Sequence, residues 1–183
     1  MHSHTNTRTT SVAAKSSKRL PAGVAHLALC LALCLAICAC DAARVYEQYR
    51  TIPGEGWHKD SCAVFDVYIS DSTMLSSLYI NLRNTSAYPF CNIYLFVKVT
   101  APSGAFTCDT VEYMLADLYG RWYGKGFSKM LDNRLAFRKH VRFPRCGAYR
   151  FEVQQGMRLD VLPYVANVGL RIERERQLDV AGE

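Results

Sequence analysis

The residue with the most specific chemistry is Cys40, which directly precedes Asp41, the first acidic residue of the 183-residue chain. Residues 20–39 are uncharged and largely apolar, and residues 1–19 are polar and carry four positive charges, as in a secretory signal peptide. The apolar run ends in Ile37-Cys38-Ala39-Cys40, with an aliphatic residue at −3 and small residues at −2 and −1. This pattern is typical of a bacterial lipobox, in which the final cysteine is lipidated. We therefore expect residues 1–39 to be a signal peptide and Cys40 to carry a covalent lipid.

An uncleaved transmembrane anchor is the alternative, because residues 20–39 approach the ~20 residues that a membrane span needs. Pro21, Gly23 and His26 weaken the beginning of such a span. A diacylglycerol on Cys40 together with an N-linked acyl chain such as palmitate would hold the protein on a membrane, since two or more chains give stable anchoring. The remaining chain would then face an extracytoplasmic compartment.

Residues 119–127, with the sequence YGRWYGKGF, are the least ordinary segment of the remaining chain. Trp122, Tyr123 and Phe127 offer large amphipathic surfaces that bind a protein partner or stack on a sugar ring. In the alternative, Trp122 and Phe127 close one end of the fold and the glycines form bulges. Trp57 has the same ambiguity, because it either fills the core or forms an exposed tip. We take Trp57, Trp122, Tyr123 and Phe127 as candidate partner-binding residues.

Residue sets for catalysis or for metal binding are scarce. Beyond Cys40 the chain has two histidines, His58 and His140, and no GxSxG, HExxH or P-loop motif. Asp109 and Glu112 lie three apart in a predicted strand and so point to opposite faces, which argues against a paired-carboxylate site. We therefore expect a protein that is not an enzyme and that has no metal or cofactor besides the lipid on Cys40.

Four cysteines follow the leader, at positions 62, 91, 108 and 146. An extracytoplasmic compartment permits disulfides, and four cysteines allow three pairings. Equally, the four residues can be small buried side chains in an envelope that is not strongly oxidising. The sequence leaves both interpretations open.

The basic character of the chain comes from its leader. Four of the 22 Lys and Arg residues precede Asp41, so 18 basic residues face 16 acidic ones in the rest of the chain. Without a clustered basic stripe, the phosphate neutralisation that nucleic-acid binding requires has no support. We expect no nucleic-acid partner.

Alternation of apolar and polar side chains predicts about seven short strands after Cys62. The pattern recurs, with polar turns between, over residues 63–69, 78–82, 91–99, 106–115, 134–143, 148–155 and 168–172. Lys139 breaks the inward face of the fifth strand. Residues 157–166 form an irregular connection or a short helix. Many short strands with almost no helical periodicity are typical of an antiparallel β-sandwich of immunoglobulin-like or jelly-roll type.

The expected organisation is a signal peptide over residues 1–39, the lipidated Cys40 and a tether over residues 40–56, and one β-sandwich domain over residues 57–183. No internal repeat or linker divides the last part.

Several motifs in this order resemble the gliding motility lipoprotein GldH family of Bacteroidetes. After Cys40 they include RVYE, GWHKD, YINLRN, YPF, NIYL, DTVEY, GRWYGKGF, VRFP, QQGMR and VGLRIE, and they extend from Cys40 to about Glu173. The chain departs from the family pattern in its four later cysteines and in its long polar N-terminal region.

The resemblance implies a non-catalytic envelope lipoprotein of the gliding machinery, which is coupled to type IX secretion. The implied location is the outer membrane, facing the periplasm, and the implied partners are other gliding or secretion proteins. Two alternatives are a glycan-binding envelope module and a general envelope-biogenesis factor.

Overall fold

The computed structural model describes residue 23 and residues 41–175. The predicted signal peptide, apart from Gly23, and the predicted lipidation site Cys40 lie outside the described residues. Residues from Asp41 onward form a compact unit of their own. Within the described part of the chain, no helix has the length and apolarity needed to cross a bilayer.

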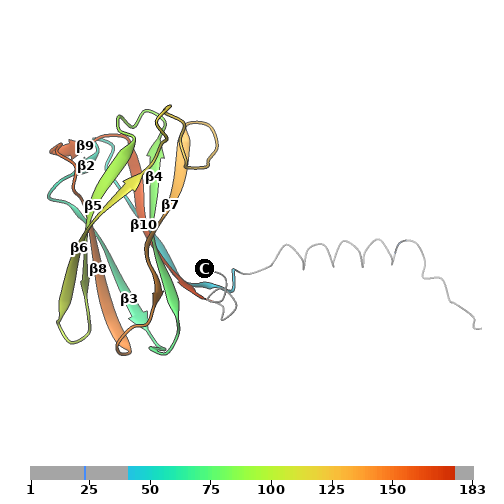
Figure 1. Cartoon of the computed structure of the whole chain (residues 1–183), viewed down its shortest axis with the longest axis vertical. Helices are drawn as coiled ribbons and strands as arrows, with labels where there is room; N and C mark the ends of the chain where they lie inside the picture. The colour runs from blue at the N-terminus through green and yellow to red at the C-terminus, as the bar shows by residue number, and fades with distance from the viewer. Residues whose placement is uncertain (1–22, 24–40, 176–183) are drawn as a thin grey trace, which may run out of the picture. The chain divides into compact units, whose positions relative to one another are not determined.

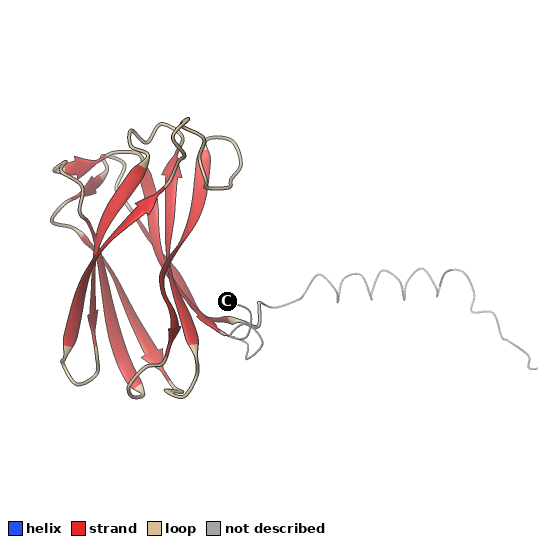
Figure 2. Ribbon diagram, in the orientation of Figure 1, coloured by secondary structure: helices blue, strands red, loops and turns tan. Residues whose placement is uncertain are grey.

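Two antiparallel four-stranded sheets face each other, as Figure 1 and Figure 2 show. The first sheet has the strand order β1 (Arg44–Thr51), β10 (Val165–Arg174), β4 (Ser76–Thr85) and β7 (Met130–Val141). The second has the order β3 (Cys62–Ile69), β8 (Gly147–Gln155), β5 (Asn92–Thr100) and β6 (Phe106–Met114). A short pair, β2 (Trp57–His58) and β9 (Val161–Leu162), completes the strands of residues 41–175. The predicted all-β sandwich is confirmed.

The core forms where the inward residues of the two sheets meet. In β3, Phe65, Val67 and Ile69 are buried while their neighbours Asp66 and Tyr68 are exposed. The same alternation buries one face of β5 and one face of β8. Because successive side chains of a strand point to opposite faces, the period of two in the sequence becomes one apolar layer between the sheets.

The segment predicted as a tether is largely a strand, so the sandwich begins before the expected boundary at residue 57. Strand β1 pairs antiparallel with β10 along its length, from Arg44 opposite Glu173 to Thr51 opposite Asn167. Its side chains are mostly polar and exposed, and only Tyr46, Glu47 and Tyr49 are half-buried, so the strand carries no clear apolar alternation. Backbone pairing and polar contacts place it on the sheet.

The break in periodicity at Lys139 marks a β-bulge. Ser76 of β4 pairs with Val141, and Leu78 pairs with Arg138, so β7 has one extra residue between these two pairs. His140 in this stretch has a positive φ of 54°. The next pair joins Tyr79 and Ala136, so Phe137 is a second extra residue of β7. Two extra residues leave the ladder locally irregular but return the alternation to the same face, and Phe137 and Val141 both pack against the core.

The sandwich has two distinct ends, defined by its connections. The proximal end contains Asp41, where the described domain begins, and the connections at residues 70–75, 101–105 and 142–146. The distal end contains the connections at residues 86–91, 115–129 and 156–160. The twelve-residue strand β7 runs from one end to the other, a distance on the order of 35 Å. Figure 1 shows the β5–β6 hairpin and the β6–β7 connection at opposite ends.

Two aromatic residues on opposite faces of β3 test the inward register. We expect Phe65→Ala to lower the free energy of unfolding by about 3–5 kcal/mol, because a fully buried ring leaves a cavity. Tyr68→Ala, at a side chain that is 72% exposed, is the matched control and should change it by no more than about 0.5 kcal/mol. Urea unfolding measures both, and equal losses in the two variants would contradict the register.

Candidate partner-binding loop and the Arg171 ion cluster

Residues 117–129 of the β6–β7 connection form a structured loop at the distal end, and we call it the distal aromatic loop. Asp117 begins it by accepting backbone hydrogen bonds at Oδ1 from Tyr119 (2.8 Å) and Arg121 (2.9 Å). The Asp117 backbone amide donates to the Arg121 carbonyl at 2.9 Å, and the Arg121 guanidinium pairs with the same carboxylate. These hydrogen bonds, led by that from the Arg121 amide, hold the pKa of Asp117 below its usual value. Asp117 therefore stays ionised and fixes a tight turn.

The second half of the loop is held on the strand that follows. Lys125 and Asp132 exchange two backbone hydrogen bonds, of 3.0 and 2.7 Å. Tyr123 donates its backbone N–H to the Leu115 carbonyl at 2.9 Å. A Cβ at Gly126 would lie 1.9 Å from the Met130 carbonyl oxygen, so only glycine fits at this close approach. The loop therefore has a backbone shape set by its own sequence.

This backbone presents apolar side chains to solvent. Leu118, Tyr119, Tyr123 and Phe127 are all exposed, with Leu118 and Phe127 more than nine-tenths exposed. Isolated exposed apolar residues are ordinary, but four of them within ten residues of one structured loop make that loop a candidate interaction surface. Lys125 and Lys129 of the same loop are also exposed, and no carboxylate of the described residues forms an ion pair with either.

The four partner-binding candidates proposed from the sequence differ in their exposure to solvent. Tyr123 and Phe127 are exposed on the loop, as a binding role requires. Trp122 is half-buried, and its ring meets that of Tyr88 edge-on at a centroid distance of 6.4 Å. Leu118 was not among the candidates, although its place directly after the turn-forming Asp117 is a usable signal.

Trp57 is a correction to the expected set. It is only 1% exposed, and its indole Nε1 donates to the Ser61 carbonyl at 2.8 Å. The Trp57 ring therefore fills the core and does not form an exposed recognition tip. An indole with its only donor satisfied and its faces buried offers nothing to a partner.

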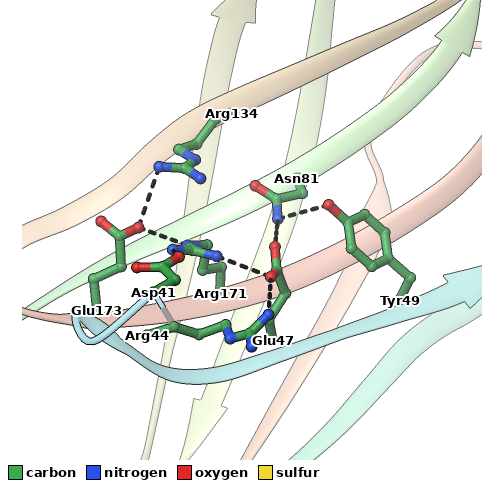
Figure 3. Close-up of polar contacts among 8 residues, drawn as sticks. All are labelled: Asp41, Arg44, Glu47, Tyr49, Asn81, Arg134, Arg171 and Glu173. Carbon is green, nitrogen blue, oxygen red and sulfur yellow. Dashed lines mark hydrogen bonds and ion pairs between the residues drawn. The ribbon is translucent and has the colours of Figure 1, made fainter. Parts of the chain in front are cut away.

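At the proximal end, Arg171 of β10 joins three carboxylates on the outer face of the first sheet (Figure 3). Its Nη1 donates to Glu47 at 2.8 Å, its Nε donates to Glu173 at 2.6 Å, and its Nη2 pairs with Asp41. The arginine side chain is only 5% exposed. We call these four residues the Arg171 cluster.

Neighbouring polar groups complete the hydrogen bonds of the Arg171 cluster. Asn81 donates to Glu47 at 3.1 Å and to the Tyr49 hydroxyl at 3.0 Å, and Arg134 donates to Glu173 at 3.1 Å. Each cluster carboxylate thus has a cationic partner and a fixed place, as a buried charge requires.

The electrostatics of the cluster favour its ionised form. Burial alone would lower the pKa of Arg171, but the hydrogen bonds with Asp41 and Glu173 and the nearby negative charges outweigh it and raise the pKa. The Arg171 hydrogen bond lowers the pKa of Asp41, against a weaker effect of burial. The contribution of Asp41 to stability is therefore present above its ordinary pKa and is lost as the pH falls through the lowered one.

The remaining candidate groups do not come together. Cys62, Cys91, Cys108 and Cys146 are all exposed free thiols, so none of the open disulfide pairings is formed in this structure. Asp109 is bound by Arg138, and Glu112 accepts from Asn92 at 2.6 Å. Within residues 41–175 no three His, Cys, Asp or Glu side chains gather as a set of metal ligands.

Removal of the buried guanidinium tests the Arg171 cluster. We expect Arg171→Ala to lower the free energy of unfolding by about 3 kcal/mol, because three carboxylates lose their common partner. The control is Arg134→Ala, which removes a half-exposed arginine from the same Glu173 and should cost no more than about 1 kcal/mol. Denaturant unfolding at neutral pH compares them, and equal small losses would show that the cluster does not stabilise the fold.

Comparison with known proteins places this structure among envelope lipoproteins. The family model described as GldH lipoprotein matches residues 44–172. The gliding motility lipoprotein GldH of Flavobacterium johnsoniae is 35% identical over 144 residues, which cover 75% of this chain and 89% of that protein. A GldH homolog of Christiangramia forsetii is also 35% identical, over 74% of this chain and 87% of that protein.

Similarity to solved structures is much weaker. The crystal structure of the infectious bursal disease virus VP2 subviral particle matches with a TM-score of 0.31 and 12% identity, over 73% of this chain and 31% of that one. The sequence matches, by contrast, span both sheets from β1 to β10. They show that this chain belongs to the GldH lipoprotein family.

Proposed function

We propose that this protein is a non-catalytic component of the gliding motility machinery, linked to type IX secretion, with a lipid on Cys40 as its membrane anchor. Its site of action is the periplasmic face of the outer membrane. There the distal aromatic loop contacts another envelope protein. The observation that carries the proposal is the exposure of four apolar side chains on a structured loop at the end opposite to Asp41.

The role in motility rests on relatives that are named gliding motility lipoproteins and that match most of their length. The anchor rests on the lipobox pattern and on the position of Asp41. Because Arg171 holds Asp41 on the first sheet, a lipid on the preceding residue would emerge directly from the proximal end. Successive Cα atoms are 3.8 Å apart, so little chain would separate the membrane from the sandwich.

The binding role of the distal aromatic loop rests on its exposure and its rigidity. Aromatic side chains with few rotatable bonds lose little entropy on binding and often dominate interface energies. The loop backbone is already ordered by the Asp117 turn and the Lys125–Asp132 pairing. Little further ordering would be needed when a partner binds.

The lipid anchor is tested by metabolic labelling with a tagged palmitic acid. We expect wild-type protein to be labelled and Cys40→Ala to remain unlabelled, because the thiol is the attachment point. Cys62→Ala is the matched control, since it removes an exposed thiol of the domain and should leave labelling unchanged. Unlabelled wild type, or equal label in Cys40→Ala, would contradict the assignment of the anchor.

The partner surface is tested by crosslinking in intact cells, followed by recovery of the tagged lipoprotein. We expect gliding or secretion proteins to be recovered with wild type and to fall at least tenfold in the double variant Tyr123→Ala/Phe127→Ala. Both side chains are exposed, so their removal should leave the fold intact. Tyr68→Ala, an exposed aromatic of the second sheet, is the control and should retain the partners.

Two outcomes would redirect the proposal. Unchanged recovery in the double variant would show that the loop is not the contact surface. Recovery of cell-wall or lipid glycan alone, lost in the double variant, would favour the glycan-binding alternative, because exposed aromatic rings also stack on sugars.

A further inference from the structure

A cleft of about 320 Å³ opens between β6 and β7, the edge strands of the two sheets, near the proximal end. Its walls include Val99, Ala101 and Phe137, and its floor consists of the buried rings of Tyr149 and Phe151. The cleft thus reaches the apolar core from the side of the sandwich. Such a volume lies at the lower end of the range for small-molecule sites.

Two polar contacts close the same edge on the distal side of the cleft. Arg138 of β7 pairs with Asp109 of β6, and the Tyr113 hydroxyl donates to the Ala136 carbonyl at 2.9 Å. On the proximal side, Phe106 is 66% exposed at the rim. The edge is therefore bridged toward the distal end and open toward the proximal end.

The lining is mostly apolar, and its polar residues besides Tyr149 are Thr107, Arg138 and Arg142. The hydroxyl of Tyr149 already donates to the Arg145 carbonyl at 2.9 Å, and the side chains of Val99, Ala101, Phe137 and Phe151 are hydrocarbon. A sugar or a peptide backbone in this cleft would leave its polar groups unpaired at considerable cost. The floor accepts an apolar chain.

Arg142, at the mouth of the cleft, is a cationic side chain with no carboxylate partner among the described residues. Arg142 is exposed, and its Nε donates to the neutral Thr73 carbonyl at 3.2 Å. No Asp or Glu of the described residues forms an ion pair with it, whereas Arg138 is already paired with Asp109. The mouth can therefore bind one anionic group beside an apolar cleft.

We propose that this cleft binds a long-chain fatty acid, with its single acyl chain between the sheets and its carboxylate on Arg142. The apolar lining, the small volume and the single uncompensated guanidinium together carry the proposal, since they match one chain and one negative charge. The expectation that a membrane supplies the fatty acid rests on the proposed lipid anchor, which puts the proximal end close to the bilayer. Binding itself does not depend on motility.

The test uses purified, lipidated full-length mature protein and a palmitic acid that carries a photoreactive group and an alkyne tag. After irradiation, we expect mass spectrometry to find the label on peptides that contain residues 99–107 and 137–143. Excess untagged palmitic acid should remove it. Labelling elsewhere in the domain, or none, would overturn the proposal.

Two pairs of variants separate the cleft from the surface. Ala101→Trp fills the cleft and should reduce labelling at least tenfold, whereas Ala148→Trp places the same ring on an exposed position of β8 and should not. Arg142→Glu should reduce labelling at least tenfold, and Arg145→Glu, an exposed neighbour, should reduce it far less. The methyl ester of the probe should label wild type and Arg142→Glu equally. Equal labelling by the acid in every folded variant would overturn the proposal.

Two further arms identify the source of the chain. An anionic phosphatidylglycerol vesicle with the same photoreactive group on one acyl chain should label the cleft much less than the free acid does; stronger labelling by the vesicle would overturn the choice of a fatty acid. If Cys40→Ala is labelled and lipidated wild type is not, the protein's own acyl chain occupies the cleft, and the proposal is wrong. Because binding is measured on purified protein, its failure is distinct from failure of the motility role.

Discussion

The guanidinium of Arg171 fixes the beginning of the domain on the fold. A charge that is nearly inaccessible to solvent must be paired, and here its partners come from Asp41, from β1 and from β10 itself. Strand β1 contributes few buried apolar side chains, so it gains less from the hydrophobic effect than the central strands do. The ion cluster adds the specific contact that sets where the chain enters the sheet. The position of Asp41 in turn defines which end of the sandwich is proximal.

Strand β1 also contains a buried polar group that destabilises the fold. The Tyr46 hydroxyl is buried without a hydrogen-bond partner, and burial also raises the pKa of that group. An unsatisfied hydroxyl costs about 1–3 kcal/mol. The aromatic ring nonetheless packs against the core, so β1 combines a modest apolar contact with a strong polar one. This balance explains why an edge strand that looks like a tether still belongs to the sheet.

Alternation of apolar and polar residues predicted most strands and therefore the fold class, because the buried and exposed faces of a strand appear as alternate positions in the sequence. The same method could not identify β1, whose register depends on partners more than 100 residues away, as the Arg171–Glu47 hydrogen bond illustrates. Nor could it decide the role of Trp57, since burial of an isolated tryptophan depends on tertiary packing. The distal aromatic loop was found through composition, but Trp122 turned inward and Leu118 outward for reasons of backbone geometry. Periodicity does not predict the order of the strands in each sheet. It therefore could not predict the cleft between β6 and β7.

The fold gives its two ends unlike surfaces. Strand β6 runs from the proximal to the distal end, so the connection that follows it must lie far from Asp41. The chain between a lipid on Cys40 and the sandwich would be one residue long, because Arg171 already holds Asp41. With the proposed lipid on Cys40, the reach of the distal aromatic loop from a membrane would depend mainly on the length of the strands, on the order of 35 Å, and little on a flexible linker. A rigid spacer of this kind loses less entropy than a long tether when its tip binds, since the position of the tip is largely determined beforehand.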